Sequence, residues 1–231
     1  MSQTPIHNHI LRLLSPDDLA LLGPFEDVDV GLRDVLEPAD TSIEAIYFMQ
    51  DGFASVVADT SGPDPVEIGL IGAEGMTGLA VALGDTQSPF ETYVQGKGSA
   101  LRADAVQVRV AMGQSEILRS VILRYARSFL TQVASTAAAN ARSSIESRLA
   151  RWLLMVEDRM GAGYPMTHDL LSIMLAVHRP GITLALQALE SQSLIKVTRG
   201  HIEIVDRKGL IMASHGAYGL AESEARRILV V

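Results

Sequence analysis

Arg179 stands at the start of a segment whose residue types could contact DNA bases. A guanidinium group offers paired donors that match O6 and N7 of guanine in the major groove. His178 and Pro180 lie beside Arg179, and Thr183 and Gln187 follow one and two helical turns later. The chemistry expected here is hydrogen bonding to base edges and phosphates, without bond making or breaking.

Two short helices joined by a tight turn are predicted around Arg179. Thr167 is a suitable N-cap for the first helix, followed by His168, and Pro180 falls in the first turn of the second, over 179–190. This is the spacing of a helix-turn-helix, in which the second helix enters the major groove. The apolar residues at helical spacing, which would form the shared core, are Leu171, Leu175, Val177, Ile182 and Leu186.

Two short strands with a tight turn are predicted directly after these helices. Leu194–Thr198 and His201–Val205 flank the dipeptide Arg199-Gly200. The hairpin would form a wing and place Arg199 at a tip that can touch phosphate. The same unit of helices could instead bind a protein, although the wing favours DNA.

A long helix is predicted over 115–143, a stretch without glycine or proline, and is followed by a hinge and a second helix over 145–160 that carries the single tryptophan, Trp152. The second half of the long helix is rich in alanine, which permits close approach of a partner helix. We expect its apolar stripe to form a dimer seam, because little of the β-rich part is left to cover it; packing within its own domain is the alternative. The predicted seam residues are Leu118, Ile122, Tyr125, Phe129, Val133 and Ala137.

The segment 31–98 is typical of a small β domain. It holds ten of the 19 glycines, and short apolar runs at 45–49, 53–58, 66–71 and 92–95 lie between its turns. One or two short helices are expected over 9–22, and 106–110 suits either a strand or a helix. A small β-sandwich or jelly-roll barrel follows from this pattern.

Charge divides the chain into two parts. The net charge is −8, but residues 145–231 carry 10 lysines and arginines against 9 acidic residues. Charge therefore permits DNA binding by the C-terminal part without arguing for it. The polar start and the lack of a long apolar run predict no membrane partner and a cytoplasmic protein.

Composition and motifs argue against several classes of site. The chain has no cysteine, which excludes disulfides and thiolate-bound iron–sulfur clusters. Its six histidines show no dense ligand pattern, so no metal site is predicted. Residues 10–167 contain no histidine, so a haem would need His7 or His9 as its axial ligand, and we do not expect one. No P-loop, G-x-S-x-G, H-E-x-x-H or G-x-G-x-x-G motif is present, so we predict that the chain is not an enzyme.

The order of these elements resembles the Crp/Fnr family of transcription regulators over nearly the whole chain, most strongly at 147–154 and from 167 to 195. The resemblance implies an α+β chain of three parts. These are a cyclic-nucleotide-binding-like β jelly-roll barrel serving as a sensor over 1–114, a dimerisation helix and hinge over 115–143, and a winged helix-turn-helix over 144–231. It further implies a homodimer that binds a pseudo-palindrome in double-stranded DNA, with RNA polymerase as a further partner.

Residue by residue, Arg179 matches the arginine that contacts guanine in the family, and Thr167 matches a phosphate-facing position. Pro180 and Leu184 replace the usual glutamate and second arginine, so the target sequence should differ. Leu184 could meet a thymine methyl group or pack inward. A regulator that acts through protein contacts, with a degenerate helix-turn-helix, is the second hypothesis.

The sensor departs further from the family. Leu79, beside Gly78, falls near the glutamate that binds ribose, and Phe90 and Glu91, followed by Thr92, fall where arginine and serine would bind the cyclic phosphate. A carboxylate there repels phosphate, so binding of cAMP in the familiar manner is not expected. Two possibilities are left for the sensor: an effector of another kind, bound in the β domain or at the helix interface, or activity without any ligand.

Overall fold

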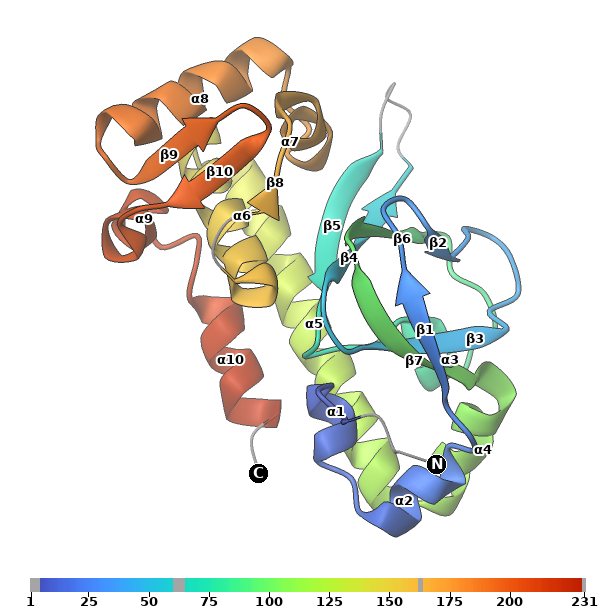
Figure 1. Cartoon of the computed structure of the whole chain (residues 1–231). Helices are drawn as coiled ribbons and strands as arrows, with labels where there is room; N and C mark the ends of the chain where they lie inside the picture. Colours follow the sequence, from blue (N-terminus) through green and yellow to red (C-terminus); the bar gives the residue numbers. More distant parts are fainter. Residues whose placement is uncertain (1–4, 60–64, 162–163, 230–231) are drawn as a thin grey trace. The chain divides into compact units, whose positions relative to one another are not determined.

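The structure is a computed structural model that describes residues 5–59, 65–161 and 164–229. The chain divides into two compact units (Figure 1). The N-terminal unit comprises Met1–Val56, Leu70–Leu130 and Ala225–Val231, and the C-terminal unit comprises Val57–Gly69 and Thr131–Glu224. The mixture of helices and strands agrees with the predicted α+β class.

The strands of the N-terminal half form two open sheets. One has the order β1-β7-β3, formed by β1 (Glu26–Val30), β7 (Gly98–Asp104) and β3 (Ala45–Met49), and both pairings are antiparallel. The other has the order β2-β6-β4-β5, formed by β2 (Val35–Glu37), β6 (Glu91–Gly96), β4 (Phe53–Ala58) and β5 (Val66–Ile71). The predicted β domain, a small β-sandwich or jelly-roll barrel, is thus present as two sheets that do not close into a single barrel.

Most elements expected from the sequence are present. The segment 9–22 forms α1 (His9–Arg12) and α2 (Pro16–Leu21). The ambiguous segment 106–110 lies in α4 (Ala105–Gln114), because the Asp104 side chain accepts a hydrogen bond from the Gln107 amide and caps the helix. A further short helix, α3 (Leu79–Ala82), precedes β6.

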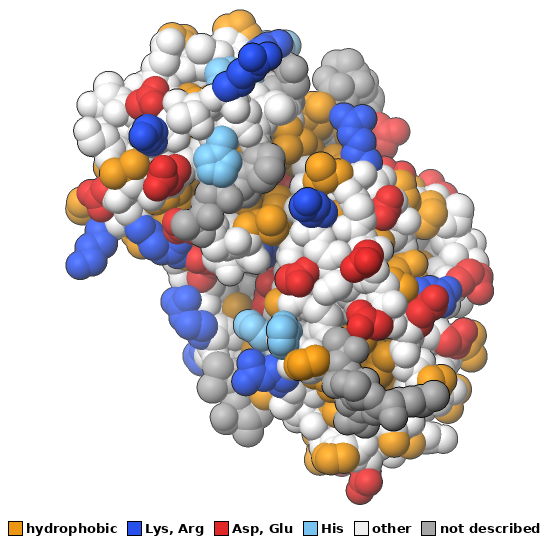
Figure 2. All heavy atoms as spheres, in the orientation of Figure 1, with side chains coloured by type: hydrophobic (Ala, Val, Ile, Leu, Met, Phe, Trp, Pro, Cys, Tyr) orange, Lys and Arg blue, Asp and Glu red, His pale blue; other side chains and the backbone are white. Residues whose placement is uncertain are grey.

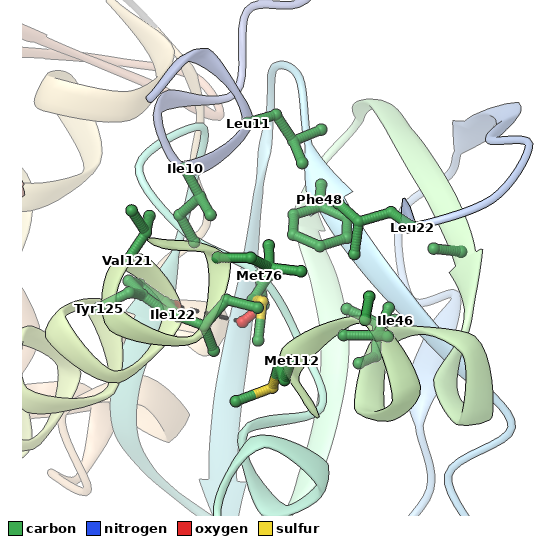
Figure 3. Packing of buried hydrophobic residues seen from close by; sticks show 14 of the residues in the cluster. Ile10, Leu11, Leu22, Ile46, Phe48, Met76, Met112, Val121, Ile122 and Tyr125 are labelled. Atoms are coloured by element: carbon green, nitrogen blue, oxygen red, sulfur yellow. Dashed lines mark hydrogen bonds between the residues drawn. The ribbon is translucent and has the colours of Figure 1, made fainter. Parts of the chain in front are cut away.

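The core of the N-terminal unit lies between the strands and the helices α1 to α5 (Figure 3). Phe48 of β3 is fully buried, and the ring of Phe25 meets it edge-on at a centroid distance of 6.1 Å. Met76 packs into the same cluster, and its carbonyl accepts a hydrogen bond of 3.2 Å from the Tyr125 hydroxyl. This contact joins the loop after β5 to the long helix α5 (Glu116–Arg142).

The first half of the apolar stripe of α5 packs into the core of the N-terminal unit. Leu118 and Ile122 are fully buried, Tyr125 is nearly so, and Phe129 packs against the same cluster. The expectation that little of the β domain is left to cover this stripe is therefore wrong. The first half of the predicted seam packs into the core of its own chain.

The C-terminal unit is built on α6 (Ile145–Met160), which the sequence predicted with the same bounds. The helices α7 (His168–Met174) and α8 (Arg179–Ser191) follow, and then a three-stranded sheet in the order β8-β10-β9. The buried ring of Trp152 belongs to the core, as predicted, and its Nε1–H donates a hydrogen bond of 2.7 Å to the buried Glu67 carboxylate. The remaining elements are β8 (Tyr164–Pro165), β9 (Ile195–Thr198), β10 (His201–Ile204), α9 (Arg207–Ala213) and α10 (Leu220–Leu229).

Candidate nucleic-acid interface

The helix α7 begins and ends where the sequence predicts. Thr167 has an extended backbone, and its hydroxyl oxygen accepts a hydrogen bond of 3.2 Å from the Leu170 amide. This satisfies one of the unpaired N–H groups at the start of the helix. The chain then turns at Ala176, whose φ of +48° is left-handed and stops the helix. The Val177 amide donates to the Ser172 carbonyl, which closes the turn.

The helix α8 follows directly and packs across α7. Its inward side chains are buried, and four of its exposed positions share one outward face. Gly181 is explained by packing: a Cβ there would lie 2.9 Å from Val177 and 3.2 Å from Ile145. The absence of a side chain lets the start of α8 approach both α6 and the turn. The buried residues are Ile182, Ala185, Leu186 and Leu189, and the outward ones are Pro180, Leu184, Gln187 and Ser191.

The structure places the predicted contact residues of α8 on one surface. Arg179 and Gln187 are exposed, as is His178, which is the N-cap but makes no capping hydrogen bond. Thr183 is half-buried and lies 3.3 Å from His168 Nδ1, while its hydroxyl donates to the Arg179 carbonyl at 3.1 Å. Thr183 therefore holds His168 beside the start of α8.

The wing has the predicted strands and one that sequence reasoning missed. β9 and β10 pair antiparallel, with Thr198 opposite His201, so that Arg199 is exposed at the tip beside Gly200. Gly200 has a φ of +73°, which only glycine adopts without strain. β8 pairs with the other side of β10, and the Met166 amide donates to the Gly200 carbonyl at 2.9 Å. Of the predicted turn at 161–165, positions 162 and 163 lie outside the described residues.

Side chains of α6 hold the ends of α7 and α8 in place through hydrogen bonds. The Arg148 guanidinium donates to the Leu175 carbonyl at the end of α7, and burial lowers the pKa of Arg148. The Gln192 amide donates to the Glu146 carboxylate at 2.9 Å, which ties the end of α8 to α6. Arg148 and Glu146 are positioning residues that the helix pattern alone could not reveal.

The segment 147–212 matches the family model of the Crp-like helix-turn-helix domain. It covers the greater part of α6, α7, α8 and the wing, the elements just described. This part of the chain is therefore similar in sequence to Crp-like helix-turn-helix domains. The resemblance to Crp/Fnr regulators seen in the sequence is thereby confirmed for the module that carries Arg179.

Solved structures show that most of the chain has the fold of such regulators. A CRP-family transcriptional regulator from Thermus thermophilus gives a TM-score of 0.70 at 13% identity, over 84% of this chain and 98% of the other. FixK2 from Bradyrhizobium japonicum gives 0.70 at 13%, over 81% and 96%. The c-di-GMP-responsive global regulator CLP from Xanthomonas campestris gives 0.65 at 12%, over 82% and 99%. Comparison with curated protein sequences gave no match.

In the N-terminal unit, a residue that the sequence did not single out joins the predicted pocket residues. The buried Glu37 carboxylate accepts a hydrogen bond of 2.8 Å from the Gly78 amide, and Glu37 lies opposite Thr92 in the β2–β6 ladder. Burial raises the pKa of Glu37. Gly78 needs its left-handed φ of +73° and lacks room for a Cβ, which would lie 2.7 Å from Ile46.

The other predicted pocket residues lie at the margin of this group. Leu79, the first residue of α3, packs against the core cluster. Phe90 is exposed and its amide donates to the Ser88 hydroxyl at 3.1 Å, while Glu91 is half-buried at the start of β6. The structure thus brings Gly78 and Thr92 together around Glu37, with Phe90 at the surface.

The outward face of α5 carries a second stripe, which differs from the predicted one. Leu123 and Leu130 are exposed, with 67% of Leu130 accessible to solvent. The stripe continues through exposed alanines, and its members alternate in steps of three and four residues, the spacing of a coiled-coil seam. Of the six predicted seam residues, Ala137 lies on this face and Val133 is half-buried. We call the set the outward stripe: Leu123, Arg127, Leu130, Ala134, Ala137 and Ala141.

Charged side chains are distributed differently over the two units. On the face shown in Figure 2, several acidic side chains cover the N-terminal unit, where Glu26, Asp29 and Asp34 are exposed. In the C-terminal unit, Arg207 pairs with Glu157 and Asp158, so its charge is already compensated.

Within the described ranges, no group of three or more histidine and acidic side chains could hold a metal ion, and no helix could span a membrane.

Proposed function

We propose that this chain is a transcription regulator that binds double-stranded DNA with sequence specificity and acts by binding rather than by catalysis. The observation that carries the proposal is the exposed outer face of α8, with Arg179 at its N-terminal end, within a Crp-like helix-turn-helix domain. The N-terminal residues of such a helix contact base edges in the major groove. Arg199 at the wing tip and Thr167 at the start of α7 are exposed and suited to phosphate.

The regulator is proposed to act as a homodimer through the outward stripe of α5. The alternating three- and four-residue steps favour left-handed packing against a second copy of the same helix. Alanines at 134, 137 and 141 would let the two helices approach closely there. A two-fold dimer presents two α8 helices, so its operator should be a pseudo-palindrome with half-sites about one helical turn apart.

The functional division of the chain follows from this proposal. Residues 1–114 serve as the sensor, 115–143 as the dimerisation helix and hinge, and 144–231 as the DNA-binding part. DNA as the partner implies work in the cytoplasm, and RNA polymerase remains an expected further partner. An effector would act by favouring one arrangement of the hinge, and its influence is limited to its difference in affinity between arrangements.

The sensor is proposed to work without cAMP. A phosphate needs N–H donors and cations, but the Gly78 amide already donates to the Glu37 carboxylate. A second carboxylate, on Glu91, follows close by in the chain, beside the exposed Phe90. Calorimetric titration of the full chain with cAMP should give no heat of specific binding, and micromolar binding would contradict this part of the proposal.

Selection of bound sequences from a random duplex pool at two salt concentrations tests DNA binding. The purified protein without added ligand should enrich a two-fold symmetric motif, with lower recovery at higher salt because binding releases counterions. Arg179→Ala should remove one preferred base pair from each half-site. Recovery of no motif would contradict DNA binding by the ligand-free protein.

A second candidate function is regulation through protein contacts with a helix-turn-helix that no longer binds DNA. Two observations favour it. Residues 145–231 contain 10 basic and 9 acidic residues, so their net charge is close to zero. The outward face of α8 is uncharged and is formed by Pro180, Leu184, Gln187 and Ser191. No enriched motif at either salt concentration, together with no salt-sensitive binding to duplex DNA, would support this candidate over the first.

A further inference from the structure

Leu184 is an exposed leucine on a helix that otherwise separates apolar and polar residues. It is 67% accessible to solvent, whereas the other apolar side chains of the helix core, such as Ile182 and Leu186, are buried. The alternative that Leu184 packs inward is therefore excluded. The fold does not require a leucine at this position.

The neighbours of Leu184 make it part of the proposed DNA-contacting surface. Pro180 and Gln187 lie one turn to either side of it on the same outward face, and Arg179 begins the helix. The face carries no acidic side chain between Arg179 and Gln187. A helix lying in the major groove by this face would bring Leu184 against the edges of bases.

The chemistry of the groove restricts what a leucine can contact. Base pairs present hydrogen-bond donors, acceptors and one apolar group, the C5 methyl of thymine. Leucine has no polar atom in its side chain, so packing against an amino or carbonyl group would desolvate that group without replacing its hydrogen bond. Contact with a methyl group instead removes apolar surface of both partners from water.

We infer, on the basis of the proposed function, that Leu184 recognises a pyrimidine C5-methyl group in the operator. In unmodified DNA that group belongs to thymine, and 5-methylcytosine presents the same group. Leu184 follows Arg179 by five residues, which is about 7.5 Å along the helix. With about 3.4 Å between base pairs, the thymine should lie within about two base pairs of the guanine bound by Arg179.

The test replaces single thymines of the selected operator by uracil, which removes only the methyl group. At one position in each half-site, the wild-type protein should bind about twofold to fourfold more weakly, the effect of exposing one methyl-sized apolar group. A cytosine placed at that position should gain a similar factor when it is methylated at C5. This second arm separates the methyl group from the hydrogen-bonding pattern of thymine.

Two variants identify the side chain responsible. Leu184→Ala should bind the thymine and uracil operators equally, because the shorter side chain no longer reaches the methyl group. Leu220→Ala removes a leucine of similar exposure, 63%, from α10 and should keep the discrimination. Both positions are exposed, so neither variant should lose its fold.

The outcomes separate this inference from the function on which it rests. A symmetric motif whose affinity is the same with uracil at every thymine, or a Leu184→Ala protein that still discriminates, overturns recognition by Leu184 and leaves DNA binding intact. A pool that yields no symmetric motif overturns both proposals. Discrimination by the wild type that is lost only with Leu184→Ala supports both.

Discussion

Leu130 is the more exposed of the two leucines in the outward stripe, and its substitution by alanine tests the proposed dimer most directly. The change removes three carbon atoms, each contributing about 0.8 kcal/mol when it is fully buried. Because 67% of the side chain is still accessible in the single chain, about two thirds of this free energy is available to the interface. A two-fold dimer carries the substitution in both copies, so the free energy of dimerisation should become less favourable by about 3 kcal/mol.

A loss of about 3 kcal/mol corresponds to a dimer dissociation constant roughly 200-fold higher. Sedimentation equilibrium over a wide concentration range measures this constant for wild type and variant. Leu83→Ala is the matched control, because Leu83 is 68% exposed but follows α3 rather than lying on α5. Equal dissociation constants for Leu130→Ala, Leu83→Ala and the wild type would refute the assignment of the seam.

Three further predictions concern single side chains. Arg179→Ala should cost about 1–3 kcal/mol of operator affinity and relax the preference at one base position in each half-site. Arg199→Ala should weaken binding to all sequences alike and reduce the slope of log affinity against log salt concentration by about 1. Binding titrations at several salt concentrations measure both effects, and an equal loss on all sequences for Arg179→Ala would speak against base contact. Burial raises the pKa of Glu37, so the wild type should lose stability relative to Glu37→Gln as pH rises from about 4 through the folded-state pKa; urea unfolding at pH 4 and 7 measures this, and a difference that does not change with pH would contradict it. Glu67→Ala leaves the indole N–H of Trp152 without its acceptor and should cost about 1–3 kcal/mol; the emission of this single tryptophan should change in the folded protein, and unchanged stability and emission together would disprove the contact.

The helix-turn-helix could be predicted from the sequence because its caps and turns depend on residues that are close together in the chain. Thr167 caps α7, Pro180 occupies the first turn of α8, and Gly200 turns the wing, each through an interaction with residues close to it in the chain. The strands β3, β4 and β5 were predicted with their observed bounds, because apolar runs there are short and bounded by turns. Such signals need no knowledge of distant partners.

The missed features depend on contacts between distant segments. In β1, Val30 is buried and Val28 is half-buried, but the other three residues are acidic and exposed, so its strand is fixed by pairing with β7, which lies far along the chain. Glu37 gives no local sign that the Gly78 amide will meet its carboxylate. For α5, apolar residues lie on two faces, and the sequence does not say which face the chain's own core will cover. The three- and four-residue steps from Leu123 to Ala141 were nevertheless present in the sequence and could have suggested the outward stripe.

The weak charge of the DNA-binding part makes the proposed dimer essential to the proposed recognition. Residues 145–231 have 10 basic and 9 acidic side chains, and the charge of Arg207 is compensated by two carboxylates, so one copy can make few phosphate contacts. A second α8 on the same duplex adds its contacts at a high effective concentration once the first is bound. Leu130→Ala should therefore weaken operator binding at protein concentrations below the new dissociation constant, although Leu130 lies on α5 and not on α8. An effector that alters the seam would control DNA binding in the same way, with no need to reach α8.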